Sequence, residues 1–214
     1  MLQRERESVM PKKLNEKELK RRLVDYILSQ FPKCELIGVE VPFVSMKRRV
    51  DVLLVTAKKE LIAYEIKSDV DSLRRWKDQK NDYKQTFDKL YIVTSERFKD
   101  ISLKSDFIGR IYINGNIKEK KVAKTVTRLN KKNLACFIWK DKIVKMGYDK
   151  KESVEVLRTK LINDSKNIAT IRELAINSLL GRYSKRFEMF KKYKEQKTSL
   201  ADLDYLTKDF NLNL

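Results

Sequence analysis

Three charged residues interrupt two apolar stretches of this sequence, and their types and spacing could support chemistry. Asp51 lies near the start of the run V-D-V-L-L-V-T, and Glu65 and Lys67 lie at the end of E-L-I-A-Y-E-I-K. Runs this rich in Val, Ile and Leu indicate strands that are buried on both faces. A buried charge is costly unless it is paired or binds a metal ion. Two carboxylates and an ammonium in core strands therefore predict a functional site.

A hairpin would bring these three groups together. Glu65 and Lys67 are two residues apart, so a strand points both side chains to the same face. If residues 57–59 form the loop, Asp51 lies directly opposite Glu65, with the two Cβ atoms roughly 4.5–5.5 Å apart. A shift of one residue in register would turn Asp51 to the other face. The sequence therefore predicts one face that carries two carboxylates and a lysine.

Adjacent carboxylates repel each other unless a cation lies between them, and hard oxygen ligands suit Mg²⁺ or Mn²⁺. Such an ion polarises a phosphoryl oxygen and lowers the pKa of a bound water. Lys67 would stabilise the developing charge or orient the attacking water. This combination is typical of a phosphodiesterase. The alternative is a structural ion pair between Lys67 and one carboxylate, which is less favoured because one lysine cannot neutralise two acids.

Composition narrows the classes of partner and of function. The 214 residues include 49 Lys and Arg against 30 Asp and Glu, a formal net charge of +19. This charge predicts an anionic partner, most simply nucleic acid. The sequence has no His, which excludes His-based catalysis and zinc sites with His ligands, and its two Cys lack metal-ligand spacing. With no apolar run of the roughly 20 residues of a membrane span and no export signal, a cytoplasmic protein without a membrane partner is expected.

The elements around the three charged residues are predicted in the order helix, three strands, helix, strand. The first helix covers about 14–30, the first strand 35–44, the second helix extends from a capping region at 68–72 to about 87, and the next strand covers 90–94. We therefore expect an α/β domain with a central mixed sheet flanked by helices.

The second half of the chain predicts a further strand, a basic segment and a helical tail. The strand covers 107–113, and residues 117–132 read as a basic strand followed by a loop. Residues 133–145 suggest one helix beside the sheet, and helices follow from 153, with a pause at Gly181. The predicted organisation is a core over residues 13–148 and a basic helical extension over residues 149–214.

Three further polar residues are candidates for the site. Glu16 lies in line with the apolar stripe of the first helix and could reach the metal as a third ligand; the simpler alternative is a first-turn acid that interacts with the helix dipole. Glu40, in the first strand, is a weaker candidate ligand, for which a surface salt bridge is favoured. Gln79, in the second helix, could hydrogen-bond the attacking water or a phosphate, or be an ordinary boundary residue.

Basic residues cluster next to Asp51 and in the segment 117–132. Beside a metal site, such side chains contact the phosphates of a nucleic acid. The alternative is a solvated basic loop. The candidate nucleic-acid-binding residues are Lys47, Arg48, Arg49, Arg74, Arg75, Lys120, Lys121 and Lys124.

Asp51, the motif Glu65-Ile66-Lys67 and Gln79 together resemble the PD-(D/E)XK, or restriction-endonuclease-like, nuclease superfamily. The wider string R-V-D-V, then Y-E-I-K-S-D-x-D-S-L, is similar to a family of short bacterial and phage proteins of unassigned function placed in this superfamily. The resemblance is good from about Arg48 to Thr94 and looser as far as Met146.

The resemblance implies a restriction-endonuclease-like fold, dependence on Mg²⁺ or Mn²⁺, and phosphodiester hydrolysis. Asp51 and Glu65 would bind the metal and Lys67 would assist the water. Val50 replaces the proline that gives the superfamily its name, which leaves the metal ligands intact. Members often dimerise to cut both strands, so a homodimer is one option. The leading hypothesis is a metal-dependent nuclease acting on DNA; the alternatives are a catalytically silent module that binds nucleic acid or a host protein, and an RNA nuclease.

Overall fold

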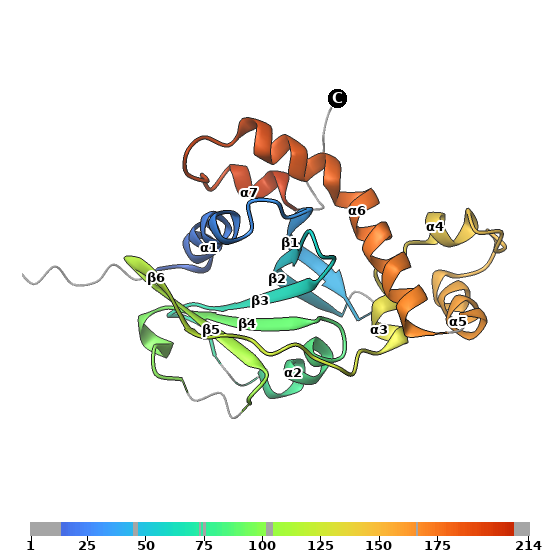
Figure 1. Cartoon of the computed structure of the whole chain (residues 1–214), viewed down its shortest axis with the longest axis horizontal. Helices are drawn as coiled ribbons and strands as arrows, with labels where there is room; N and C mark the ends of the chain where they lie inside the picture. Colours follow the sequence, from blue (N-terminus) through green and yellow to red (C-terminus); the bar gives the residue numbers. More distant parts are fainter. Residues whose placement is uncertain are drawn as a thin grey trace, which may run out of the picture.

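The centre of the protein is a six-stranded sheet in the order β1-β2-β3-β4-β5-β6. The computed structural model describes residues 14–44, 47–72, 74, 76–101, 105–165 and 167–207 (Figure 1). The strands are β1 (Leu36–Phe43), β2 (Arg48–Val55), β3 (Leu61–Lys67), β4 (Lys89–Thr94), β5 (Ile108–Asn114) and β6 (Asn116–Lys121). β1 to β3 are antiparallel, β3 to β5 are parallel, and β6 is antiparallel to β5. The predicted mixed α/β sheet is confirmed.

Helices flank this sheet and extend beyond it. They are α1 (Glu16–Gln30), α2 (Trp76–Lys84), α3 (Lys131–Ala135), α4 (Lys140–Val144), α5 (Val154–Asp164), α6 (Ile168–Tyr193) and α7 (Asp202–Tyr205), with a 3₁₀ turn at Glu96–Phe98. α1 and α2 lie on opposite sides of the sheet in Figure 1. The order α1-β1-β2-β3-α2-β4 is the predicted one. In the described part of the chain, we find no helix with the length and apolar character that crossing a bilayer requires.

Local sequence explains why α1 and β3 form. The side chain of Asn15 accepts a hydrogen bond of 2.9 Å from the backbone N–H of Glu18, which caps the first turn of α1. Leu19 and Leu23 are fully buried on its inner face. Every residue of β3 is buried, as expected of a strand covered on both faces. Glu65 and Lys67 are therefore buried charges in a core strand.

The second helix begins later than predicted, at Trp76. Asp71 accepts hydrogen bonds from the backbone N–H and the hydroxyl of Ser68, both at 2.7 Å, and so closes a turn directly after β3. Asp69 accepts from the hydroxyl of Ser95 and the backbone N–H of Arg97. The two carboxylates thus stabilise the loop after β3 instead of starting the helix.

The predicted pause at Gly181 is wrong, because α6 is one continuous helix of 26 residues. Glycine lowers helix stability by about 1 kcal/mol, and tertiary packing outweighs this. Leu179, Tyr183 and Phe187 are buried around that position. The single helix expected over 133–145 is instead the pair of short helices α3 and α4, and α7 was not predicted.

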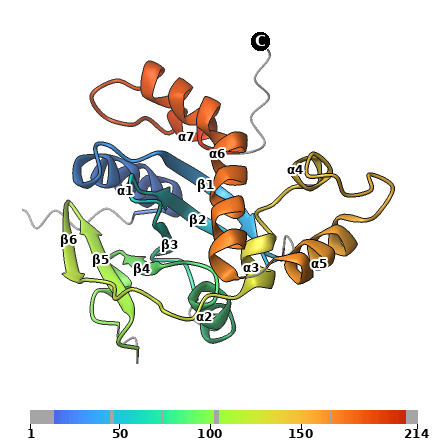
Figure 2. The ribbon, with the colours of Figure 1, turned by 45° about the vertical axis from the view of Figure 1, so that its right-hand side comes forward.

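The two predicted parts of the chain share one hydrophobic core. Buried residues of α6, among them Ile171 and Phe187, belong to the same cluster as the apolar residues of the sheet. The backbone N–H of Val39 in β1 donates to the carbonyl oxygen of Leu206 at 2.9 Å. Figure 2 shows α6 and α7 beside the β1 edge. The C-terminal region therefore packs on the edge of the sheet that carries Glu40, and the boundary at 148/149 stays a prediction.

Candidate metal centre

β2 and β3 pair in the predicted register. Val52 lies opposite Tyr64, and continuing this register by one residue places Asp51 opposite Glu65. At the loop end, the backbone N–H of Thr56 donates to the carbonyl oxygen of Glu60 at 3.1 Å. One oxygen of Asp51 accepts a hydrogen bond of 2.6 Å from the backbone N–H of Ile66. The Asp51 carboxylate is thereby fixed against the end of β3.

The Glu65 carboxylate is held on both of its oxygens. Lys67 Nζ donates to Glu65 Oε1 at 2.6 Å, and the hydroxyl of Tyr83 on α2 donates to Glu65 Oε2. Glu65 is 5% exposed and Lys67 is 8% exposed. The ion pair considered as an alternative interpretation of Lys67 is thus present in the structure. This contact of Tyr83 with Glu65 joins α2 to the site.

A third carboxylate on the neighbouring strand approaches Asp51. The β1–β2 ladder passes from the Val39–Val52 pair to the Val41–Val50 pair, which leaves Glu40 opposite Asp51. Glu40 has a φ of +53°, a left-handed conformation that is uncommon for a residue other than glycine. Backbone strain of this kind clusters at functional sites.

Glu16, Glu40 and Asp51 each contribute an oxygen to one group in which these atoms lie within 4.8 Å of one another. The three residues come from α1, β1 and β2, so the fold brings them together from separate elements. Glu65 is not part of this group, and its oxygens bind Lys67 and Tyr83. Glu40, expected mainly as a surface salt-bridge residue, belongs to the carboxylate group.

Lys20 on α1 forms ion pairs with two of these acids, Glu16 and Glu40. It is 6% exposed, and its Nζ lies 2.8 Å from Glu16 Oε1 and also donates to Glu40. Sequence analysis missed Lys20. The available signal was its spacing, four residues after Glu16 on the helix, which places the two side chains on one face.

The shifts in pKa at the site reflect burial and the closeness of the acids to one another. Burial and the nearby Glu65 raise the pKa of Asp51 well above its usual value, and Lys20 offsets only part of this effect. Burial alone would lower the pKa of Lys20, but Asp51, Glu16 and Glu40 outweigh it and the pKa is raised. Burial, with Glu65 and Asp51, also raises the pKa of Tyr83, so its hydroxyl stays a donor.

The formal charges of the connected side chains do not cancel. The four acids contribute four negative charges and the two lysines contribute two positive charges, so the formal net charge of the group is −2. One divalent cation would neutralise this charge. The side chains counted are Glu16, Lys20, Glu40, Asp51, Glu65 and Lys67.

Gln79 lies one helical turn before Tyr83 on α2, so both side chains are on the same face of that helix. Its Oε1 is buried and has no hydrogen-bond partner among the described residues. An unsatisfied buried acceptor costs about 1–3 kcal/mol. A donor supplied by a water molecule or a substrate would remove this cost, and the role expected for Gln79 stays a prediction.

The predicted nucleic-acid-binding residues differ in their surroundings. Arg48 pairs with Asp82 at 3.0 Å, and Lys121 donates to the carbonyl oxygen of Ser105 at 2.9 Å. Arg75 lies outside the described residues. The assignment of this set to phosphate contacts stays a prediction. Lys47, Arg49, Arg74, Lys120 and Lys124 are exposed members of this set.

We expect the variant Asp51→Asn to be more stable than the wild type at high pH when metal is absent. Because the folded protein raises the pKa of Asp51 above 3.8, it binds the proton more tightly than the unfolded chain does. Wild-type stability therefore falls as pH rises through this window, and the neutral amide avoids the loss. We expect a melting temperature about 2–4 °C higher at pH 8, which is about 1 kcal/mol for a domain of this size.

Thermal unfolding with EDTA between pH 4 and pH 8 measures this difference, which should shrink toward pH 4. Asp106→Asn, at an exposed position, is the control and should match the wild type at every pH. A variant Asp51→Asn that is less stable than the wild type at pH 8 would contradict the raised pKa.

Comparison with known proteins gives a family. The model of the family described as bacteriophage P4 protein cII matches residues 10–207. Protein cII of Enterobacteria phage P4 is 29% identical over 218 residues, which cover 93% of this chain and 80% of that protein. A solved structure of a protein of unknown function from Silicibacter pomeroyi is similar at 18% identity and a TM-score of 0.44, and the match covers 71% of this chain and 93% of that one.

Proposed function

The chain belongs to the bacteriophage P4 protein cII family, and from its geometry we propose that it is a metal-dependent nuclease that hydrolyses phosphodiester bonds in DNA. This proposal rests on the close approach of the carboxylates of Glu16, Glu40 and Asp51, with Glu65 opposite Asp51. The neighbouring lysines are too few to neutralise these four acids. Mg²⁺ or Mn²⁺ prefers such oxygen ligands and would supply the missing charge.

Asp51 occupies the centre of the proposed site. It has Glu65 on one side and the pair Glu16 and Glu40 on the other. The oxygens of Glu16, Glu40 and Asp51 would hold the ion, and Glu65 would join them by giving up its contact with Lys67. When bound, the ion would polarise a phosphoryl oxygen and acidify a water molecule.

The other side chains have distinct roles in this proposal. Lys67, 2.6 Å from Glu65, would donate to the phosphate or to the attacking water as negative charge develops. Tyr83 holds the Glu65 carboxylate in place through its hydroxyl. The unsatisfied Oε1 of Gln79 offers an acceptor for a proton of that water.

Two other features support a nuclease. The element order α1-β1-β2-β3-α2-β4, with the charged residues at the ends of central strands, agrees with the restriction-endonuclease-like fold that the sequence resembles. The net charge of +19 favours association with a nucleic acid through its phosphates.

A second candidate function is a silent nuclease-like module that binds DNA without cutting it. The close Glu65–Lys67 ion pair favours it, because both groups already have partners in the structure. The two functions differ in what the site does with a divalent ion, and a metal titration together with a cleavage assay separates them.

The test is a cleavage assay of the purified protein on plasmid, single-stranded and branched DNA and on RNA, with Mg²⁺, Mn²⁺ or EDTA. We expect cleavage of DNA that requires the metal and is lost in Asp51→Ala, Glu65→Ala and Lys67→Ala. Cleavage that persists in these variants would reject the site. A wild type that binds DNA but cuts nothing would support the silent module, and faster cleavage of RNA would support an RNA nuclease.

A further inference from the structure

A cavity of about 530 Å³ adjoins the carboxylate group on the side of α1 and β1. Glu16, Lys17, Lys20 and Glu40 form its charged end, and Val39 and Leu200 line it with apolar surface. The outer wall is the C-terminal segment, residues 198–207, which contains α7. The cavity and the proposed metal site therefore share Glu16 and Glu40.

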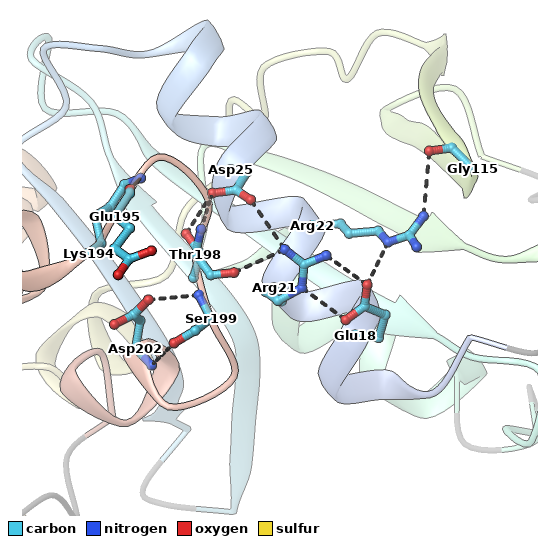
Figure 3. A network of polar contacts seen from close by, with 10 residues as sticks. All are labelled: Glu18, Arg21, Arg22, Asp25, Gly115, Lys194, Glu195, Thr198, Ser199 and Asp202. Carbon is cyan, nitrogen blue, oxygen red and sulfur yellow. Dashed lines mark hydrogen bonds and ion pairs between the residues drawn. The ribbon is translucent and has the colours of Figure 1, made fainter.

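The C-terminal segment is fixed to α1 at its first residue. The backbone N–H and the hydroxyl of Thr198 both donate to Asp25, at 2.9 and 2.6 Å, and Arg21 donates to the carbonyl oxygen of Thr198 at 2.9 Å. Figure 3 shows this network, with Arg21 lying between Thr198 and Glu18. Thr198 is fully buried.

The far end of the C-terminal segment is fixed to the sheet and to α6. The carbonyl oxygen of Leu206 accepts from the backbone N–H of Val39 at 2.9 Å, and the carbonyl oxygen of Thr207 accepts from Arg186 at 2.6 Å. Val39 directly precedes Glu40, whose backbone is left-handed. The wall of the cavity is thus held by the same contacts that fix the strand at Glu40, so the cavity is preformed.

The chemistry of the lining indicates the class of ligand. The charged end carries Glu16 and Glu40 beside Lys17 and Lys20, so a phosphate is attracted there by the two ammonium groups together with a divalent ion bound to the carboxylates. The remaining surface is largely apolar, with Asp204 and Thr207 as polar groups at its edge. An apolar cavity of this size with a few polar groups is typical of a site for one small organic group.

We propose that the cavity binds one unpaired nucleotide of the DNA substrate. The base lies against Val39 and Leu200, its polar edge faces Asp204 or Thr207, and its phosphate lies at the end formed by Glu16 and Glu40. A base in a duplex enters such a cavity only after unstacking, whereas a single-stranded end or a mismatched base enters at lower cost. This inference rests on the proposed nuclease function and names its substrate class: DNA with a single-stranded end or an unpaired base.

The test measures binding instead of cleavage, by fluorescence anisotropy in Ca²⁺. The probes are a blunt duplex, the same duplex with one overhanging nucleotide, and an overhang that lacks its base. We expect the wild type to bind the overhang about fivefold more tightly than the other two. Leu200→Glu should abolish the preference, and Val156→Glu should keep it. Leu200 and Val156 are similarly exposed, at 49% and 44%, but Val156 lies on α5 and does not line the cavity.

Ala201→Leu fills the cavity from a second position and should also abolish the preference. Equal binding of the three probes by the wild type, or a preference that survives in both Leu200→Glu and Ala201→Leu, would overturn the nucleotide site even if the protein cleaves DNA. A wild type that neither binds nor cleaves DNA would overturn the proposed function together with this inference.

Discussion

We expect Lys67→Met to lower the rate of the proposed metal-dependent DNA cleavage by about 10²–10³-fold, the loss that follows when one donor that stabilises transition-state charge is removed. Methionine keeps the length and apolar stem of the lysine in its buried position but removes the ammonium that lies 2.6 Å from Glu65. The same change frees one oxygen of Glu65, so the affinity for Mn²⁺ stays the same or rises. Catalysis and metal binding therefore change in different directions.

Single-turnover cleavage at saturating metal measures the first effect, and calorimetric titration with Mn²⁺ measures the second. Lys89→Met is the matched control, because Lys89 also forms an ion pair, 2.9 Å from Glu60, but lies at the other end of the parallel β3–β4 pair. We expect Lys89→Met to cleave at the wild-type rate. If Lys67 only forms an ion pair with Glu65, the Lys67→Met protein is less stable but its folded fraction cleaves DNA at the wild-type rate. That outcome would contradict a catalytic role for Lys67.

The part of the site that could be predicted from the sequence depends on patterns of residues that are close together in the chain. Two buried apolar runs predict the pairing of β2 with β3, and the three-residue loop between them sets the register. Asp51 opposite Glu65, and Lys67 beside Glu65, follow from that register. The cap at Asn15 follows in the same way from residues close in sequence.

The remaining part depends on contacts between residues that are distant in sequence. Lys20 reaches Glu40 across 20 positions, and Leu206 reaches Val39 from the far end of the chain. A local pattern contains no information about such pairs. Tyr83 illustrates the ambiguity, since its ring packs 4.9 Å from that of Phe43, as a packing residue should, while its hydroxyl binds Glu65.

We expect Lys20→Met to destabilise the protein without metal and to make its stability depend on a divalent ion. The substitution leaves Glu16, Glu40 and Asp51 close together with no neighbouring ammonium of their own. Breaking a buried ion pair costs about 3–5 kcal/mol; Glu16 and Glu40 are partly exposed, so we expect about 2–3 kcal/mol. For a domain of this size that is a fall of roughly 4–12 °C in melting temperature.

Because Lys20 and a metal ion would bind the same oxygens, removing Lys20 should also strengthen metal binding. Thermal unfolding with EDTA and with Mn²⁺ therefore gives a larger Mn²⁺-induced rise in melting temperature for Lys20→Met than for the wild type. Lys145→Met, at an exposed position at the end of α4, should behave as the wild type does in both conditions. Equal Mn²⁺ effects in Lys20→Met and the wild type would mean that the ion, if it binds, does not replace Lys20. The carboxylates of α1 and β1 would then hold a lysine and not a metal, and Asp51 and Glu65 alone would remain as candidate ligands.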